Sequence, residues 1–245
     1  MLYYSGTEER CIDIMKISII VPTRNRPQNV QNICKSVADT ASGFYDIELV
    51  FYVDRDDTDT INLFKDPDAA KKLNVNASVV LGDRVKLGQT YNKAYTKTTG
   101  DIIMYAADDV YFGTKNWDFL VVDEFKHFKD QICLVFGYDG IQPKGSLATH
   151  GFISRKSIDA LGYVHPGDFG YNYADNWMTE IYRQINRLRY LPIYTEHRHW
   201  GVGKATYDDT YRLGSDAPHK ESISLWEDKP RLYADIEKLR KLTVS

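Results

Sequence analysis

Two adjacent carboxylates, Asp108 and Asp109, follow directly after a short apolar run in the middle of the chain. The run Ile102-Ile103-Met104 shows no alternation of apolar and polar residues, which is typical of a strand covered on both faces in a parallel sheet. Open α/β sheets bind ligands just beyond the carboxyl ends of their strands. Carboxylate oxygens there suit Mg²⁺ or Mn²⁺, which usually accompanies a phosphate-bearing ligand. The alternative is that the pair only opens a turn, because Asp is common in turns.

Two histidines in the C-terminal third of the chain are a second pair of candidate ligands. His197 and His199 are two residues apart, so on an extended segment their side chains face the same way. They could bind Mn²⁺, with His199 slightly preferred, or orient phosphate oxygens as hydrogen-bond donors. A pair of surface histidines is the competing interpretation. Lys204 follows in a glycine-bearing stretch; it could face a diphosphate, and a solvated lysine is an equal alternative.

Polar loops also follow two earlier apolar runs. Residues 17–21 and 47–53 are rich in β-branched and other apolar residues, a pattern that predicts buried strands. An aspartate that ends the second strand, Asp54, could accept a hydrogen bond from a base N–H or a ribose hydroxyl. Arg24 and Arg26 could contact the same ligand, or could be solvated or paired with the acidic segment that begins at Asp54. The loop after the first strand contains Pro22, Thr23, Arg24 and Arg26.

Strands and helices alternate along most of the chain, which predicts an α/β fold with one mainly parallel sheet flanked by helices. Apolar runs predict strands at 17–21, 47–53, 77–81, 102–104, 132–136 and 189–194. Helical spacing predicts helices at 27–40, 87–100, 117–128 and 156–161, a broken helix interrupted at Pro67, and helices that start near Asp175 and at Pro230. Residues 140–152 are expected to be loop-rich, and 165–173 to form a mobile loop. We expect an N-terminal extension at 1–16, one domain at 17–215 and a C-terminal helical extension at 216–245.

The composition restricts the class of protein. The 245 residues are 43% hydrophobic and 27% charged, with a net charge of -3, so the chain has no broad basic field for non-specific binding of nucleic acid. Three cysteines without metal-like spacing predict reduced, mostly buried thiols. The apolar runs are too short to cross a bilayer, and residues 1–13 do not resemble a signal peptide. We therefore expect a cytoplasmic protein, of unknown oligomeric state.

Several segments in order resemble family 2 glycosyltransferases, which have the GT-A fold. Ile17-Ser18-Ile19-Ile20-Val21-Pro22-Thr23-Arg24-Asn25-Arg26 is similar to the opening strand and loop of that family, and Leu49 to Asp54 to its second strand. Leu87-Gly88-Gln89 with Asn92 resembles the helix before the metal motif, and Gly100 to Asp109 resembles the metal motif D-x-D. Gly151-Phe152 with Arg155, and then Ala174-Asp175-Asn176-Trp177, resemble the acceptor-side segment with its catalytic carboxylate.

The resemblance implies roles for individual residues. Asp175 would be the catalytic base, Asp108 the main metal ligand and Asp109 its companion. The residues expected to bind the donor are Pro22, Thr23, Arg24, Arg26, Asp54, Gly88, Gln89, Asn92 and Lys204. The residues expected to bind the acceptor are Gly151, Tyr173 and Trp177. A competing interpretation of Asp175 is the N-cap of the helix that follows.

Three departures from the family pattern stand out. Ala106 occupies the position of the first Asp of D-x-D, and Ala174 precedes Asp175 where the family has Glu. The Q-x-x-R-W motif of processive members is absent, so a processive polymer synthase is not expected.

The resemblance therefore predicts a metal-dependent inverting glycosyltransferase that uses Mn²⁺ or Mg²⁺ and a nucleotide sugar, with a UDP-sugar favoured as donor. Two alternatives remain: a catalytically inactive nucleotide- or glycan-binding module of the same fold, and a sugar-nucleotide pyrophosphorylase, which would require a glycine-rich loop after the first strand. The acceptor could be a glycan, a small molecule or a modified nucleobase in phage DNA. DNA would require a local basic groove, for which the candidate residues are Arg183, Arg187, Arg189, Lys238, Arg240 and Lys241.

Overall fold

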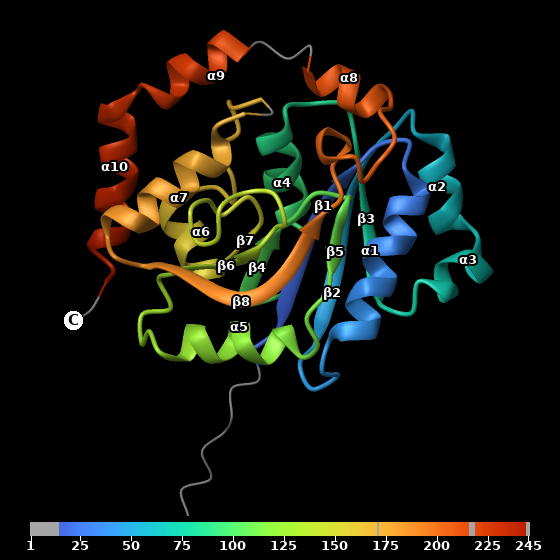
Figure 1. Cartoon of the computed structure of the whole chain (residues 1–245), viewed down its shortest axis with the longest axis horizontal. Coiled ribbons are helices and arrows are strands. Elements are labelled where there is room, and N and C mark those ends of the chain that lie inside the picture. The colour runs from blue at the N-terminus through green and yellow to red at the C-terminus, as the bar shows by residue number, and fades with distance from the viewer. Residues whose placement is uncertain (1–14, 171, 216–218, 244–245) are drawn as a thin grey trace, which may run out of the picture.

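The computed structural model describes residues 15–170, 172–215 and 219–243. Within these residues the chain forms one mixed eight-stranded sheet with helices on both faces (Figure 1). The order across the sheet is β3-β2-β1-β4-β7-β6-β8-β5. The strands are β1 (Ile17–Thr23), β2 (Ile47–Asp54), β3 (Asn76–Gly82), β4 (Ile102–Tyr105), β5 (Val110–Phe112), β6 (Leu134–Tyr138), β7 (Gly151–Ser154) and β8 (Leu188–His197).

The helices form a layer on each face of the sheet. On one face, Val30 and Ile33 of α1 and Val121 of α5 pack against the sheet in one core. On the other face, Tyr91 of α4 and Ile181 of α7 belong to a second core. The helices are α1 (Pro27–Thr40), α2 (Thr58–Lys65), α3 (Pro67–Lys72), α4 (Leu87–Tyr95), α5 (Trp117–Lys126), α6 (Arg155–Leu161), α7 (Ala174–Gln184), α8 (Asp209–Ser215), α9 (His219–Trp226) and α10 (Lys229–Arg240), with a 3₁₀ turn η1 (Trp200–Val202).

Parallel pairing brings the polar loops together. Ile17 of β1 lies opposite Ile47 of β2 on one side and Ile102 of β4 on the other, and both pairings are parallel. These strands are buried on both faces, as their continuous apolar sequences predict. Because neighbouring parallel strands end at the same edge of the sheet, the segments after β1, β2 and β4 meet there.

The α/β fold with a single sheet is confirmed, and the sheet also contains two strands that the sequence did not predict. β5 and β7 have only three and four residues, too few to show a period. β7 lies in the centre of the sheet, antiparallel to both β4 and β6. It begins at Gly151, within the stretch expected to be loop-rich. β8 extends three residues beyond its predicted end, so that His197 lies on a strand.

The last two helices, α9 and α10, run along the outer side of α7 (Figure 1). Leu232, Ile236 and Leu239 of α10 are buried in the same core as Trp177 of α7. The predicted domain limits remain predictions, because residues 1–14 and 216–218 lie outside the described residues. In the part of the chain that the structure describes, no helix is long and apolar enough to cross a membrane.

Candidate functional site

A cavity of about 440 Å³ opens at the carboxyl edge of β1, β2 and β4. Its lining combines groups from the whole chain: the loop after β1, the ends of β2 and β4, the first turn of α7, the end of β8, and α8. The predicted residues that line it are Pro22, Thr23, Arg24, Arg26, Asp54, Asp108, Asp109, Asp175, His197 and His199. The fold therefore brings together predicted residues that are up to 177 positions apart (from Pro22 to His199) in one site.

Asp108 is buried, and both of its carboxylate oxygens are bound by donors from the N-terminal part of the chain. Thr23 Oγ1 donates to Oδ2 at 2.8 Å, and Arg26 Nη1 donates to Oδ1 at 2.9 Å. Asn29 Nδ2 makes a longer contact with Oδ1, at 3.4 Å. Burial raises the pKa of Asp108 to about 6, because the nearby charge of Arg26 only partly offsets the loss of solvent.

Asp109 is also buried, but its partners come from the C-terminal part of the chain. Tyr211 Oη donates to Oδ2 at 2.7 Å, and His197 Nε2 lies 3.2 Å from Oδ1. The His197 contact is an ion pair, and Oδ1 accepts no hydrogen bond from any other described residue. Burial alone would raise the pKa of Asp109, but His197 and Tyr211 outweigh it and hold this pKa below its usual range. The same pair raises the pKa of His197.

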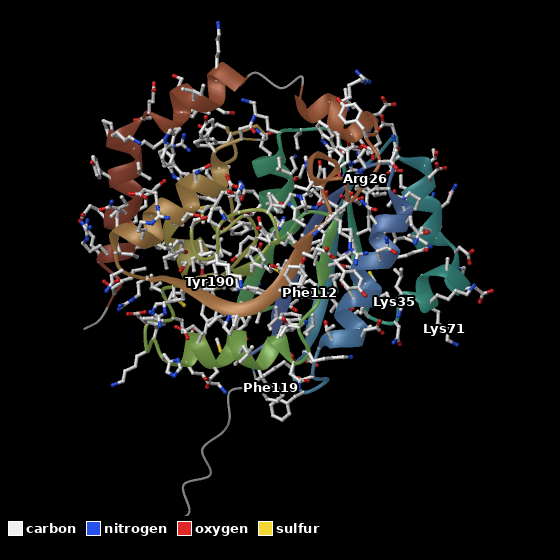
Figure 2. All side chains as sticks on the ribbon, viewed as in Figure 1. Arg26, Lys35, Lys71, Phe112, Phe119 and Tyr190 are labelled. Carbon is white, nitrogen blue, oxygen red and sulfur yellow. The ribbon has the colours of Figure 1, made fainter. Side chains whose placement is uncertain are left out.

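Arg26 links the loop after β1 to the segment that leads into α8. Its Nε and Nη2 donate to the two oxygens of Asp208 at 2.7 and 2.8 Å, and its guanidinium lies 3.9 Å from the ring centroid of Tyr211. Figure 2 shows Arg26 beside α8, at the opposite end of the molecule from Phe119. Arg24 binds Asp54 Oδ2 at 2.8 Å and also binds Asp56. The salt bridge considered from the sequence therefore exists, and it lies at the wall of the cavity.

Asp175 lies in the first turn of α7. The residue at the N-cap is Tyr173, with a positive φ of 68°, so Asp175 does not cap the helix as the competing interpretation supposed. The Asn176 N–H donates to Asp175 Oδ1 at 2.9 Å. Burial raises the pKa of Asp175 to about 6, partly offset by backbone N–H groups, and the charges of Asp139 and His197 act in opposite directions. A carboxylate with this pKa is suited to accept a proton near neutral pH.

Two cavity residues that sequence reasoning missed are His150 and His165. Both are buried, and neither Nδ1 has a hydrogen-bond partner among the described residues. Burial lowers the pKa of each imidazole to about 3, so both are neutral at physiological pH. His150 packs edge-on against His197, with ring centroids 4.9 Å apart. Each is an isolated histidine in an irregular segment, and no spacing signal marks it.

The segment after β8 also contributes residues that the sequence did not single out. Tyr211 and Asp208 hold Asp109 and Arg26, as described above. His197 and His199 do lie together, with ring centroids 5.2 Å apart. His199 Nδ1 accepts the Gly201 N–H at 3.1 Å, and the ring packs edge-on against Tyr211.

The other predicted site residues lie outside the lining of this cavity. Lys204 donates to Glu196 at 2.8 Å, and Tyr173 stacks on Trp226. Trp177 is fully buried, and its Nε1 donates to Tyr163 and Asp235. A role for these three in ligand binding remains a prediction, and any contact by Trp177 would require the core to open.

Four further predicted residues lie next to the cavity lining rather than in it: Gly88, Gln89, Asn92 and Gly151. Asn92 binds the backbone of Val164 and His165. A Cβ at Gly88 would lie 2.1 Å from the Pro166 carbonyl oxygen, and a Cβ at Gly151 would lie 2.6 Å from Tyr105 Oη. Ala106 is buried, and its carbonyl accepts the Tyr91 hydroxyl, so this position belongs to the core. The fourth of these residues, Gln89, accepts the Lys86 N–H with its Oε1 at the start of α4.

Comparison with known proteins identifies the class. Residues 18–208 match the model of glycosyl transferase family 2, and the chain belongs to this family. It is accordingly a glycosyltransferase with the GT-A fold. No curated protein matches the chain in sequence.

Solved structures of similar fold share little sequence with the chain. A mannosyltransferase from Pyrobaculum calidifontis, in complex with GDP-Man and Mn²⁺, has a TM-score of 0.62 at 14% identity, over 93% of this chain and 70% of that one. S. aureus TarS 1–349 with UDP-GlcNAc has a TM-score of 0.57 at 14% identity, over 94% and 82% of the two chains. Glucosyl-3-phosphoglycerate synthase from Mycobacterium tuberculosis, with Mn²⁺, UDP-Glc and phosphoglyceric acid, has a TM-score of 0.58 at 15% identity, over 91% and 80%. At these identities the likeness shows the fold alone.

Proposed function

We propose that the chain is a metal-dependent, inverting glycosyltransferase that moves a sugar from a nucleotide sugar to an acceptor hydroxyl. The observation that carries the proposal is that one cavity, in a member of this family, contains Asp54, Asp109 and Asp175 together. These three carboxylates come from three elements, and each suits a different part of such a reaction: the nucleoside, the diphosphate and the acceptor.

The nucleotide is proposed to bind at the ends of β1 and β2. Asp54 can accept a hydrogen bond from a base or ribose, and its pKa is raised by burial despite the bond to Arg24, so its remaining oxygen gains from a donor supplied by a ligand. The similar structures named above contain UDP-sugars or GDP-Man. A UDP-sugar is the donor that we favour.

The metal is proposed to bind at Asp109 rather than at Asp108. In the described residues no three His, Cys, Asp or Glu side chains are grouped as a ready metal site. However, Asp109 Oδ1 is buried, and the imidazole of His197 is its one partner among the described residues. Both oxygens of Asp108 already accept hydrogen bonds. Asp109 and His197, with His199 adjacent, would hold a divalent cation once His197 has lost its proton, because only a neutral imidazole ligates a metal. When bound, the cation would neutralise charge on the departing diphosphate.

Asp175 is proposed to be the base. The acceptor oxygen attacks the anomeric carbon from the face opposite the diphosphate, and the bond between that carbon and the diphosphate oxygen breaks, which inverts the configuration. The proton of the acceptor hydroxyl passes to Asp175. The raised pKa of Asp175 supports this role, because a base with a pKa close to the working pH is both ionised and effective.

The acceptor is proposed to be a glycan or a small molecule, and DNA is less well supported. Five of the six basic side chains considered for a groove are paired with acidic side chains. The pairs are Arg183–Glu180, Arg187–Asp130, Arg189–Glu124, Lys238–Asp235 and Arg240–Glu237. Pairing cancels the local field that attraction of phosphates would require. We also propose a reducing, cytoplasmic setting, supported by the buried free thiols of Cys34 and Cys133.

A donor panel tests the proposal. Thermal melting of the chain is measured with UDP, GDP, CMP and dTDP sugars, with and without Mn²⁺. Binding to the folded state alone raises the melting temperature. We expect one nucleotide class to raise it, more strongly with Mn²⁺, and Asp175→Asn to keep the shift and lose transfer. No shift with any nucleotide in either condition would contradict the proposal.

A further inference from the structure

His165 is a buried side chain of the cavity that the proposed reaction does not use. Its ring lies between Tyr91 and Tyr105, with centroids 5.2 and 5.1 Å away. The hydroxyls of both tyrosines are already engaged, with the carbonyls of Ala106 and Ala148. His165 lines the cavity, and its Nδ1 has no hydrogen-bond partner among the described residues. A buried polar atom without a partner costs about 1–3 kcal/mol, so a ligand that supplies the partner is favoured.

The backbone around His165 is held firmly. Asn92 Nδ2 donates to the His165 carbonyl at 2.8 Å, and Asn92 Oδ1 accepts the N–H groups of Val164 and His165 at 2.8 and 3.3 Å. Gly88 permits the close contact between α4 and Pro166. The imidazole is therefore fixed before any ligand enters, which is what a recognition residue requires.

The surroundings of His165 specify the chemistry of its ligand. Burial accounts for its lowered pKa, so the imidazole is neutral at physiological pH. A neutral imidazole has one donor and one acceptor nitrogen, which matches a hydroxyl group. A phosphate would instead require cations; of the arginines that line this cavity, Arg24 and Arg26 are held by Asp54 and Asp108, and the charge of Arg84 acts on Asp54.

We propose that His165 hydrogen-bonds a hydroxyl of the transferred sugar and thereby helps to select which sugar the enzyme accepts. The inference rests on the proposed function and identifies a residue for the sugar itself. The donor sugar is favoured over the acceptor because the tyrosines that enclose His165 also hold the end of β4. Tyr105 is the last residue of β4, and the Tyr91 hydroxyl binds the carbonyl of Ala106, just before Asp108 and Asp109. A sugar joined to a diphosphate at Asp109 lies nearest to this wall.

The test compares donors with and without their sugar. Calorimetric titration measures the affinities of UDP, GDP, UDP-glucose, UDP-N-acetylglucosamine and GDP-mannose, with Mn²⁺, for the full chain and for His165→Phe. His165→Asn keeps polar atoms close to the position of Nδ1, and His127→Phe makes the same change at a histidine whose side chain is 63% exposed. No acceptor is added, so only the donor is probed.

The expected result is specific to the sugar. His165→Phe should weaken the preferred sugar nucleotide about 10- to 100-fold, the effect of one buried hydrogen bond, and change the affinity for the bare nucleoside diphosphate by less than about 2-fold. His165→Asn should recover part of the loss, and His127→Phe should change neither affinity. Without ligand, His165→Phe should melt no lower than the natural chain, because it removes an unpartnered polar atom. A structural role would instead lower the melting temperature.

Two outcomes would overturn the inference. If the natural chain binds a sugar nucleotide and His165→Phe binds it equally well, or loses affinity for UDP and for the UDP-sugar to the same extent, His165 does not bind the donor sugar. If the natural chain binds none of the nucleotides, the proposed function fails first and the inference fails with it. The natural chain alone distinguishes these two failures.

Discussion

The two ends of the cavity use different chemistry. At the arginine end, Arg24 and Arg26 hold buried carboxylates in ion pairs, so these two arginines have partners without a ligand. At the histidine end, His150 and His165 have unpartnered nitrogens, and Asp175 has a raised pKa because burial removes solvent that nothing fully replaces. Arg24 and Arg26 are therefore paired in the free protein, whereas one ring nitrogen of each of the two histidines is not.

The adjacent aspartates Asp108 and Asp109 differ in their partners and in their pKa shifts. Asp108 is bound by Thr23 and Arg26, and burial raises its pKa to about 6, whereas the pKa of Asp109 lies below its usual range beside His197. Neighbours in sequence thus have opposite shifts, because burial outweighs the charge of Arg26 at Asp108, whereas His197 and Tyr211 outweigh burial at Asp109. This comparison supports our proposal that Asp109 binds the cation, and it shows Asp108 paired with Arg26.

The largest expected effect concerns Asp175 at the histidine end. Asp175→Asn keeps the size of the side chain and removes the base. Transfer should fall about 10²- to 10⁴-fold, since that is the usual contribution of a positioned base. Nucleotide affinity, which we assign to the arginine end, should change by less than about 2-fold. The measurements are steady-state transfer and calorimetry; equal losses in both would remove the distinction between the ends.

Substitution of Arg26 tests the arginine end through the free energy of unfolding. Arg26→Met leaves Asp108 buried without its cation and should lower the free energy of unfolding by about 3 kcal/mol at neutral pH. The loss should shrink below pH 6, because Asp108 then takes up a proton. Arg55→Met is the matched control: its pair with Asp83 is exposed, and its loss should be below about 1 kcal/mol. Equal losses in urea unfolding would show that Arg26 and Asp108 are not a buried pair.

The pH dependence of transfer and of stability tests the role of Asp175 at the histidine end. Asp175 must be ionised to act, so kcat/KM should fall about tenfold per pH unit below pH 6. The raised pKa also means that the folded state favours the protonated form; the stability this form contributes is complete below the ordinary Asp pKa and is lost as pH rises through 6. Asp175→Asn should therefore melt higher than the natural chain at pH 8 and not at pH 4. A higher melting temperature at both values would point to packing rather than charge.

The smallest effect is expected at Lys204. Its ammonium pairs with Glu196, 35% of its side chain is exposed, and it lies outside the cavity lining. Lys204→Met should weaken donor binding by less than about 3-fold, because exposed ion pairs contribute little. A loss above tenfold in the calorimetric affinity would show that the segment after β8 moves over the diphosphate.

Local sequence patterns predicted most of the strands and helices of this molecule. The short strands and the partners of the site residues depend on contacts between residues that are distant in sequence. The buried runs of β1, β2 and β4, with the rule that ligands bind at strand ends, predicted that Asp54, Asp108 and Asp109 would lie in one site. β5 and β7 were missed because three or four residues carry no periodicity. Without β7, nothing in the sequence places His150 beside the cavity.

The partners of the predicted residues were also beyond sequence reasoning. Tyr211 is 102 positions from Asp109, and Asp208 is 182 positions from Arg26, so neither contact follows from local spacing. His165 carries no motif and becomes notable only through its enclosure between Tyr91 and Tyr105. The sequence ranked Asp108 above Asp109 as a metal ligand; once their partners are known, the structure favours the reverse order as a proposal.

The most direct test is a crystal structure of Asp175→Asn with the sugar nucleotide that the donor panel selects and Mn²⁺. We predict the nucleoside beside Asp54, the diphosphate and Mn²⁺ beside Asp109, and the sugar against Tyr105 with a hydroxyl in hydrogen-bond reach of His165. A nucleotide bound outside this cavity, or bound in the opposite direction with its base beside residue 175, would contradict the assignment of the two ends.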